Sequence, residues 1–290
     1  MTKPQVFHIG IPKSGTTTLQ NILNNDDRLF VSRSSVFTTK DWWFKGSALN
    51  TSTDKIVIES NETIISGGFN KVKFIQVVER LYRTNKNAQV VVTIREQRSA
   101  LNSMFKYHIK NNYEGVESFQ NWLYNSNLGM DYISLCMYSN IAKTLLAYFP
   151  KEQIHFLFFE ELKINPILFY EKIYAIIGIP LHSRNIDSEA RNVMGYNADQ
   201  LYTLACINKY SFTKAKNSGY GYFKGLRSLE NKLKFAFVKR FYLKCNIDFF
   251  SIDKVGNIQN VYDDFKYNNQ ILIDLGFVTE DEINKYNYLR

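Results

Sequence analysis

Cysteine and long apolar runs are both scarce in this sequence. Its 290 residues include three cysteines, Cys136, Cys206 and Cys245, which lie far apart and form no Cys-x-x-Cys pair. An odd and scattered set argues against a disulfide framework and against a cysteine zinc site. No apolar run approaches the ~18 residues of a transmembrane helix, and a strand pattern that begins at Gln5 leaves no room for a signal peptide. We therefore expect a soluble cytoplasmic protein with buried free thiols.

The signatures of several functional classes are also missing. No group of Asp and His residues has the spacing of a metal site, and no internal repeat or low-complexity tract is found. The formal net charge of +9 favours anionic partners, such as nucleotides, acidic sugars, nucleic acid or a membrane surface. The basic residues do not gather into the blocks that are typical of a nucleic-acid surface. We therefore expect no metal and no nucleic-acid partner.

Short apolar runs rich in β-branched residues alternate with segments of helical periodicity. Continuous apolar runs are typical of strands that are buried on both faces of a parallel sheet, and strands that alternate with helices indicate βαβ units. The expected strands are residues 5–10, 28–32, 55–60, 89–94 and 154–159, and the helical patterns are residues 17–24, 71–84, 99–110, 118–125, 130–148 and 166–177. The prediction is an α/β fold with three layers, in which helices flank a central, mostly parallel five-stranded sheet.

The strand signal fades after Pro180. We expect one domain over residues 1–290, with an α/β core at 1–185 and a cap of helices and loops at 186–290. Ligands of open α/β sheets gather outside the carboxyl ends of the strands, so the site is expected there.

The segment "FHIGIPKSGTTTLQNIL" (residues 7–23) combines a strand, a glycine-containing turn and a helix. Such a turn is an anion cradle, because backbone N–H groups and the positive end of the helix dipole point at one spot. Gly10 and Gly15 have the spacing of the ATP-binding P-loop, but Thr16 occupies the lysine position and Lys13 lies earlier, inside the turn. A kinase lysine reaches the β- and γ-phosphates beside magnesium, whereas Lys13 would meet the first phosphate.

The stretch "PKSGTTTL" (residues 12–19) resembles the 5′-phosphosulfate loop of sulfotransferases that use 3′-phosphoadenosine-5′-phosphosulfate (PAPS). The resemblance implies the P-loop-like sulfotransferase fold, with a nucleotide-binding core at 1–185 and the cap at 186–290 on the acceptor side. It also implies that Lys13 neutralises the leaving oxygen. Many cytosolic members carry a tryptophan that stacks on adenine where this chain has Thr18, so adenine must be held differently here. The donor-binding residues that the resemblance implies are Lys13, Ser14, Gly15, Thr16, Thr17 and Thr18.

A second motif, "VVVTIREQRSALNSMF", follows the fourth predicted strand. It resembles the family's 3′-phosphate site, which has an arginine at a strand end and a serine eight residues later, and this implies that Arg95 and Ser103 bind the 3′-phosphate. A guanidinium offers bidentate contact with phosphate, and a hydroxyl adds a donor. The Arg-Glu-Gln form is similar to that of bacterial carbohydrate and lipid sulfotransferases, which implies a glycan or glycolipid acceptor.

Sulfuryl transfer also needs a base for the acceptor hydroxyl, and it requires no metal. The stretch "KIVIESNETIISGG" offers Glu62 first and Glu59 second, and Ser60-Asn61-Glu62 matches a Ser-x-Glu that follows this strand in resembling bacterial members. The alternative is a loop carboxylate that caps a turn or faces water. His8, inside the first strand, is expected to be a satisfied core residue.

The expected reaction is therefore transfer of a sulfuryl group from PAPS to a hydroxyl, which releases PAP. Two alternatives remain open, namely an ATP-dependent P-loop kinase of a small molecule and a non-catalytic nucleotide-binding protein. The basic and aromatic tract at residues 231–244 is either a surface helix with its apolar face on the core or a contact with a membrane interface or an acidic acceptor.

Overall fold

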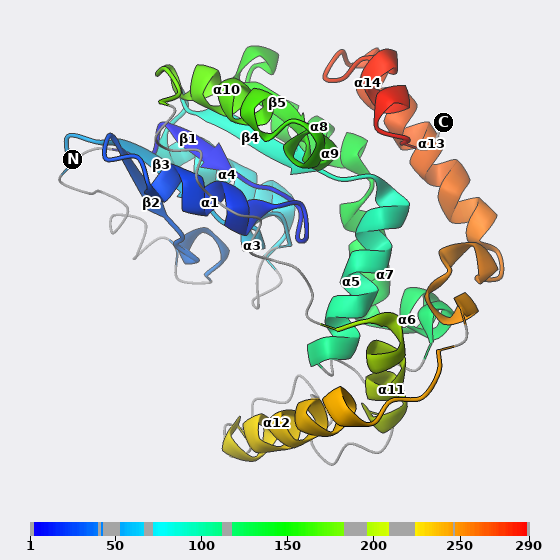
Figure 1. Cartoon of the computed structure of the whole chain (residues 1–290). Helices are drawn as coiled ribbons and strands as arrows, with labels where there is room; N and C mark the ends of the chain where they lie inside the picture. The colour runs from blue at the N-terminus through cyan, green and yellow to red at the C-terminus, as the bar shows by residue number, and fades with distance from the viewer. Residues whose placement is uncertain are drawn as a thin grey trace. The chain divides into compact units, whose positions relative to one another are not determined.

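The computed structural model describes residues 3–39, 42, 53–66, 72–111, 118–182, 196–208, 224–245 and 247–288 (Figure 1). By its internal contacts the chain forms two compact units. The first comprises residues 1–97, 135–192 and 263–290, and the second comprises residues 98–134 and 193–262. The predicted organisation as one domain with a cap at 186–290 stays a prediction.

The first unit is built on a five-stranded sheet in which every neighbouring pair is parallel. The spatial order is β2-β3-β1-β4-β5, and this confirms the predicted α/β architecture. Each strand coincides closely with one of the predicted apolar runs. The strands are β1 (Val6–His8), β2 (Leu29–Ser32), β3 (Ile56–Ser60), β4 (Gln89–Ile94) and β5 (Ile154–Phe158).

This strand order places a topological switch point at the centre of the sheet. The chain leaves β1 towards β2 on one side, and it leaves β4 towards β5 on the other side. Ligands of open α/β sheets bind at such a reversal, outside the carboxyl ends of the strands. The structure therefore singles out the ends of β1 and β4, which are followed by the Lys13 turn and by Arg95.

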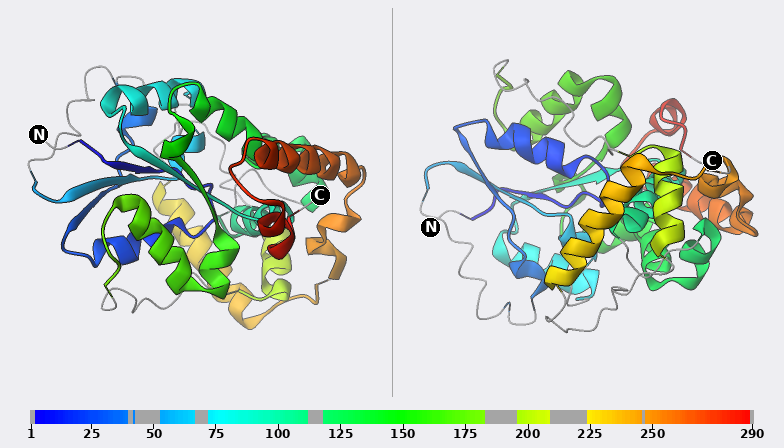
Figure 2. Two further views of the ribbon diagram at one scale, coloured as in Figure 1. Left: turned by 90° about the horizontal axis from the view of Figure 1, so that it is seen from above. Right: turned by 60° about the horizontal axis from the view of Figure 1, so that its bottom comes forward.

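The helices of the first unit cover both faces of the sheet (Figure 2). On one face, α1, α9 and α10 bury their apolar side chains in one cluster with residues of β1, β3 and β4. On the opposite face, α4 packs against α8. The helices described in this unit are α1 (Thr16–Asn24), η1 (Val36–Thr38), α3 (Thr63–Ser66), α4 (Phe74–Thr84), α8 (Tyr138–Leu146), η3 (Lys151–Gln153), α9 (Phe159–Ile164), α10 (Pro166–Ile177) and α14 (Glu280–Lys285).

The second unit is helical wherever the structure describes regular elements in it. Asn208 at the end of α11 donates a hydrogen bond of 2.9 Å to the carbonyl of Ile109 in α5. The helix α5 starts at the last residue of the first unit, and α13 begins in the second unit and continues in the first. The elements are α5 (Gln97–Asn111), α6 (Phe119–Asn125), α7 (Asn127–Leu135), α11 (Ala198–Asn208), α12 (Lys224–Arg240), η6 (Ile247–Phe250), η7 (Ile252–Lys254) and α13 (Ile258–Asp274).

Local signals explain why α10 has the bounds that the sequence predicted. The side chain of Asn165 accepts a hydrogen bond from the N–H of Leu168, and Pro166 occupies the first helical position, where its missing N–H costs nothing. Gly178 ends the helix with a left-handed φ of 85°.

The prediction of one helix over residues 130–148 was wrong in one respect, because α7 and α8 are separate helices on either side of Cys136 and Met137. The apolar spacing continues across the break, so periodicity alone did not reveal it. Among the described helices, none combines the length and the apolar character needed to cross a membrane.

Candidate active site

The turn after β1 is held in an unusual backbone conformation. The chain continues along β4 beyond the end of β1, because the N–H of Ile9 donates to the carbonyl of Val91 at 2.9 Å and that of Ile11 donates to Thr93 at 3.1 Å. Lys13 then adopts a φ of 70°, which is rare for a residue with a side chain. Such backbone conformations persist only where the surrounding structure imposes them, and they cluster at functional sites.

Ser14 closes this turn internally. Its hydroxyl donates to the carbonyl of Ile11 at 2.6 Å, and its backbone N–H donates to the same oxygen at 3.2 Å. Ser14 is fully buried. Its contribution is therefore to the shape of the turn, because its hydroxyl proton already has an acceptor.

The first turn of α1 has the features of an anion site. Gly15 at the N-cap has a φ of 82° and brings no side chain that could cap the helix, so the first N–H groups of α1 lack a side-chain acceptor in the structure as described. The buried Oγ1 of Thr16 likewise has no hydrogen-bond partner among the described residues. Thr17 is exposed and Thr18 is half-buried. Unpaired donors at a helix N-terminus fit a bound phosphate or sulfate group.

Gly10 lies where three polar side chains converge. A Cβ atom at this position would lie 3.0 Å from His8 Nε2, 3.1 Å from Ser14 Oγ and 3.1 Å from Thr16 Oγ1. Any side chain here would push these atoms apart. The glycine spacing that resembles a P-loop therefore reflects close packing beneath the turn.

Under the turn, His8 joins three strands. Its Nδ1 lies 2.8 Å from Ser60 Oγ in β3, and its Nε2 lies 2.8 Å from Thr93 Oγ1 in β4. Burial lowers the pKa of His8 to about 4, so the imidazole is neutral near pH 7. Gln20 of α1 donates to the carbonyl of Ser60 at 2.8 Å. His8 is thus a satisfied core residue that connects the ends of β1, β3 and β4.

Arg95 contacts the turn directly. Its Nη1 donates to the carbonyl of Lys13 at 2.8 Å, and its guanidinium carbon lies 4.9 Å from the ring centroid of Phe159, which begins α9 after β5. The hydroxyl of Tyr138 donates to the backbone carbonyl of Arg95 at 2.5 Å. The structure therefore brings Arg95 and Lys13 together at the switch point. Ser103 lies in α5 in the second unit, so its predicted pairing with Arg95 stays a prediction.

Glu62 lies in the turn between β3 and α3, and its neighbour Asn61 fixes this turn. The N–H of Asn61 donates to the carbonyl of His8 at 3.1 Å, its Nδ2 donates to the carbonyl of Ser34 at 2.8 Å, and its Oδ1 accepts from the N–H of Thr63 at 2.9 Å. The position of Glu62 is therefore anchored to the end of β1.

The electrostatics link Glu62 to Lys13. Partial burial of the carboxyl raises the pKa of Glu62, although the residue as a whole is exposed, and the positive charge of Lys13 acts in the opposite direction. The ammonium and the carboxyl are therefore close enough to interact.

Glu59, the second candidate base, is fully buried in β3. Burial raises its pKa to about 7, and the hydroxyl of Ser32 and the N–H of Ser34 oppose this rise. Neither carboxyl oxygen makes a hydrogen bond of good geometry with the described residues. Because Glu59 has no exposed surface, an acceptor could not touch it in this conformation, and Glu62 is the better placed of the two.

Three residues that help to build the site had no role in the sequence-based prediction, namely Gln20, Asn61 and Phe159. Each carries a weak sequence signal: Gln20 follows Thr16 by four residues on one helix face, and Asn61 and Phe159 directly follow strands. Within the described ranges, no group of three or more His, Cys, Asp or Glu residues could hold a metal ion.

Comparisons with known proteins identify a family and similar folds. The sulfotransferase domain family matches residues 3–218. A sulfotransferase from Alicyclobacillus acidocaldarius is structurally similar, with a TM-score of 0.52 and 16% identity, over 66% of this chain and 88% of that one. A search of curated protein sequences finds no significant match.

Two further solved structures are similar at lower scores. The sulfotransferase domain from the curacin biosynthetic pathway has a TM-score of 0.47 and 12% identity, over 63% of this chain and 77% of that one. Mouse sulfotransferase SULT7A1, complexed with PAP, has a TM-score of 0.44 and 13% identity, over 99% and 88%. The family match covers most of the chain, including the turn with Lys13 and the strand end with Arg95, and this protein therefore belongs to the sulfotransferase domain family.

Proposed function

We propose that this protein transfers a sulfuryl group from PAPS to an acceptor hydroxyl and releases PAP. The observation that carries the proposal is the open first turn of α1, which has the strained Lys13 before it and Arg95 hydrogen-bonded to the carbonyl of Lys13. Two cations and unpaired N–H groups around one turn suit a doubly charged phosphosulfate.

The residues of the turn fit the donor in different ways. Thr16 offers a buried hydroxyl without a partner in the described structure, and residues 16–18 offer the backbone N–H groups of the helix N-terminus. Lys13, Thr17 and Thr18 complete the proposed phosphosulfate contacts, while Ser14 and Gly15 give the turn its shape. Arg95 and Ser103 are the proposed ligands of the 3′-phosphate, with Arg95 holding the turn at the same time.

In the proposed reaction, bound PAPS supplies the sulfuryl group together with a phosphate leaving group. Glu62 accepts the proton that the acceptor hydroxyl loses as its oxygen bonds to sulfur. Lys13 stabilises the negative charge that the phosphate oxygen gains as its bond to sulfur breaks. A raised carboxyl pKa suits Glu62 for this role, because a base works best when its pKa approaches the working pH. Glu59 remains the second candidate.

The proposed acceptor is a carbohydrate or a glycolipid. Its support is the Arg95-Glu96-Gln97 sequence at the end of β4, which resembles that of bacterial carbohydrate and lipid sulfotransferases. The charge of +9 is compatible with an acidic glycan.

Thermal-shift measurements with PAP and with ATP–Mg²⁺ test the donor assignment. A ligand that binds only the folded state raises the apparent stability by about 2.7 kcal/mol at a hundredfold excess over its Kd. We expect PAP to raise the Tm and ATP–Mg²⁺ to leave it unchanged. A shift with ATP–Mg²⁺ and none with PAP would reject the sulfotransferase assignment in favour of a kinase.

Variants of Lys13, Glu62 and Glu59 in a radiolabelled-PAPS acceptor screen test the roles of these residues. Lys13→Ala is expected to lose turnover by roughly a hundredfold or more, as is typical when a transition-state charge loses its donor, whereas the exposed Lys143→Ala serves as a control. Glu62→Gln is expected to lower turnover and to keep PAP affinity. Full activity of Lys13→Ala would remove its proposed role, and an inactive Glu59→Gln beside an active Glu62→Gln would reverse the assignment of the base.

A further inference from the structure

The helix α12 buries one side against α11. Lys234 and Val238 are buried, and Lys234 Nζ donates to Asn208 Oδ1 at 3.3 Å. The ring of Phe235 lies 5.5 Å from that of Tyr196, just before α11. These contacts lie within the second unit, and they define the face of α12 that packs against α11, its neighbour in Figure 1.

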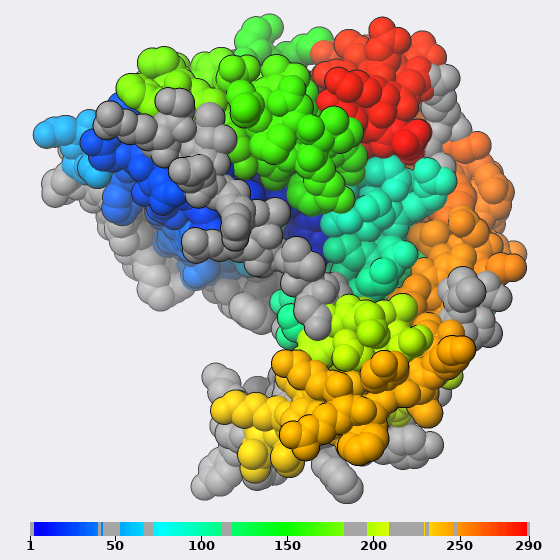
Figure 3. Space-filling view, viewed as in Figure 1, coloured from blue at the N-terminus to red at the C-terminus, as the bar shows by residue number. Residues whose placement is uncertain are grey.

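The outward face of α12 carries an apolar stripe. Leu229, Leu233, Phe237 and Phe241 follow one another at intervals of four residues, and they are 55%, 63%, 52% and 62% exposed. Side chains four residues apart lie on one side of a helix. With Tyr242 and Leu243 included, this segment contributes six of the twelve large hydrophobic side chains that are exposed in the described residues. Figure 3 shows the described part of α12 on the surface of the molecule.

Cations accompany the stripe. Lys232, Lys239, Arg240 and Lys244 are all exposed, and Glu230 is the one acidic residue in the sequence of 229–244. On a helical projection Arg240 falls within the apolar stripe, and Lys232 and Lys239 lie beside it. The segment therefore combines large apolar side chains with positive charge on one surface.

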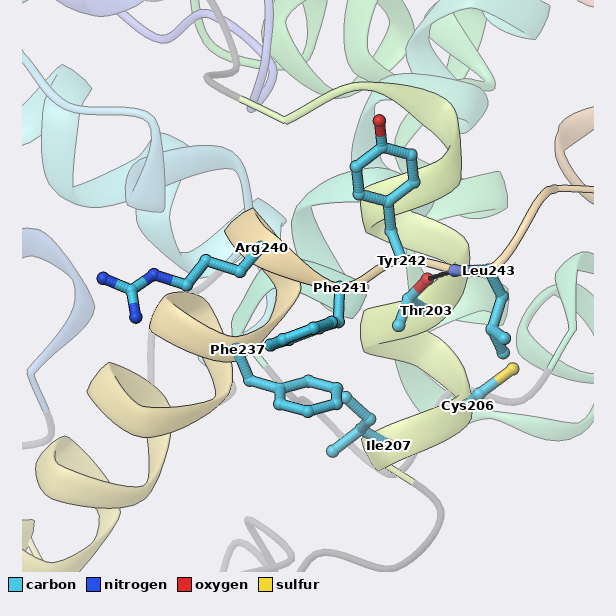
Figure 4. A pocket seen from close by; sticks show the side chains of 8 residues that line it. All are labelled: Thr203, Cys206, Ile207, Phe237, Arg240, Phe241, Tyr242 and Leu243. Carbon is cyan, nitrogen blue, oxygen red and sulfur yellow. Dashed lines mark hydrogen bonds between the residues drawn. The ribbon is translucent and has the colours of Figure 1, made fainter.

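The end of the stripe is hollowed by a cavity of about 620 Å³, which lies between α11 and the residues that follow α12 (Figure 4). The rings of Phe237 and Phe241 lie 5.4 Å apart on its wall, next to Ile207, and the guanidinium of Arg240 points away from them. The N–H of Leu243 donates to Thr203 Oγ1 at 2.8 Å, and this hydrogen bond ties the residues that follow α12 to α11.

We propose that the exposed side chains of residues 229–244, the α12 ridge, dock on the surface of an anionic lipid bilayer. Aromatic and aliphatic side chains that project beside Lys and Arg are the composition of interfacial membrane-binding helices. The cations select an anionic headgroup layer, and the apolar stripe enters the boundary with the acyl chains. An acidic glycan would interact with the cations alone, and it would leave the six large apolar side chains exposed to water. The proposed contact with the membrane is therefore peripheral.

Vesicle sedimentation of the full chain tests this proposal without measuring activity. We expect the protein to pellet with vesicles of phosphatidylcholine and phosphatidylserine, and to stay in solution with phosphatidylcholine alone. Lys239→Gln/Arg240→Gln should weaken binding roughly fivefold for each charge removed. A protein that remains in the supernatant with anionic vesicles overturns the proposal.

A matched pair of double variants separates the ridge from general surface hydrophobicity. Leu233→Ser/Phe237→Ser should abolish pelleting, whereas Ile164→Ser/Ile167→Ser should retain it, because these two are also exposed, at 69% and 49%, but lie on α9 and α10. All substituted side chains are exposed, so both variants should keep the wild-type circular dichroism. Equal pelleting of both variants would reject the ridge. The proposal would also be rejected if sedimentation velocity showed a dimer that is lost only in the ridge variant, because the ridge would then bind a second copy of this chain.

Discussion

At the scale of single residues, Thr16 is the clearest indication of a ligand. Most buried polar atoms in folded proteins have a hydrogen-bond partner, and each exception calls for a specific explanation. Thr16 Oγ1 is buried without a partner in the described structure, and it lies at the first turn of a helix that no side chain caps. A bound anion would satisfy both the hydroxyl and the helix terminus.

Replacement of Thr16 by valine tests this assignment. Thr16→Val keeps the shape and removes an unpaired hydroxyl, so the free protein should lose no stability. Because hydrogen bonds to charged groups contribute about 1.5–3 kcal/mol, PAP affinity should fall roughly tenfold to a hundredfold in titration calorimetry. Thr38→Val is the reciprocal control, since the hydroxyl of Thr38 donates to the carbonyl of Ser35 at 2.9 Å. It should lower stability by about 1 kcal/mol and leave PAP affinity unchanged.

At the scale of elements, the turn between β1 and α1 depends on its contacts with α9. A Cβ atom on Gly15 would lie 2.8 Å from a Leu162 carbon and 2.9 Å from two carbons of the Phe159 ring. Gly15 therefore serves two needs, a left-handed backbone and close packing of the turn on α9. Gly178, at the end of α10, has a similar φ of 85°, but a Cβ atom there would meet no atom of the described residues within 4 Å.

The two glycines form a matched pair for alanine substitution. Both changes place a side chain in the left-handed region, which costs about 1–2 kcal/mol. Gly15→Ala adds a steric clash, for which overpacking costs about 1–3 kcal/mol more. We expect urea unfolding to show this difference, and we expect PAP binding to weaken only in Gly15→Ala. Equal losses of stability for the two variants would mean that the turn can move away from α9 freely.

At the scale of the whole molecule, the sheet buries two titratable groups whose pKa values shift in opposite directions. Burial raises the pKa of Glu59 to about 7 and lowers that of His8 to about 4. In both cases the neutral form is favoured in the folded state. The stability of the protein must therefore depend on pH.

Glu59→Gln isolates one of these contributions. The folded pKa of about 7 exceeds the ordinary value of 4.5, so the contribution of Glu59 is fully present below about pH 4.5 and declines as the pH rises to about 7. Relative to wild type, Glu59→Gln should thus gain stability over this window, by on the order of 3 kcal/mol, and the gain should stay constant at higher pH. Urea unfolding across this range measures the difference. Parallel pH profiles for the two proteins would contradict a buried neutral carboxyl.

Features that depend on near neighbours in the chain follow from the amino-acid sequence alone. Apolar runs rich in β-branched residues specified the five strands, and Asn165, Pro166 and Gly178 specified the bounds of α10. The glycine-containing turn was equally readable, because its glycines and Lys13 lie within six residues of one another. Local chemistry decides each of these features, so no tertiary information was needed.

The meeting of the strand ends, in contrast, depends on contacts between residues that are far apart in the chain. His8 joins Ser60 and Thr93, which lie 52 and 85 residues away, and Arg95 reaches the carbonyl of Lys13 across 82 residues. The same pairing of strands buries Glu59 and leaves Glu62 exposed beside the charge of Lys13. These outcomes depend on which strands become neighbours and on which face of the sheet each side chain lies. Hydrophobic burial determines the strand order and the facing only when the whole sheet forms.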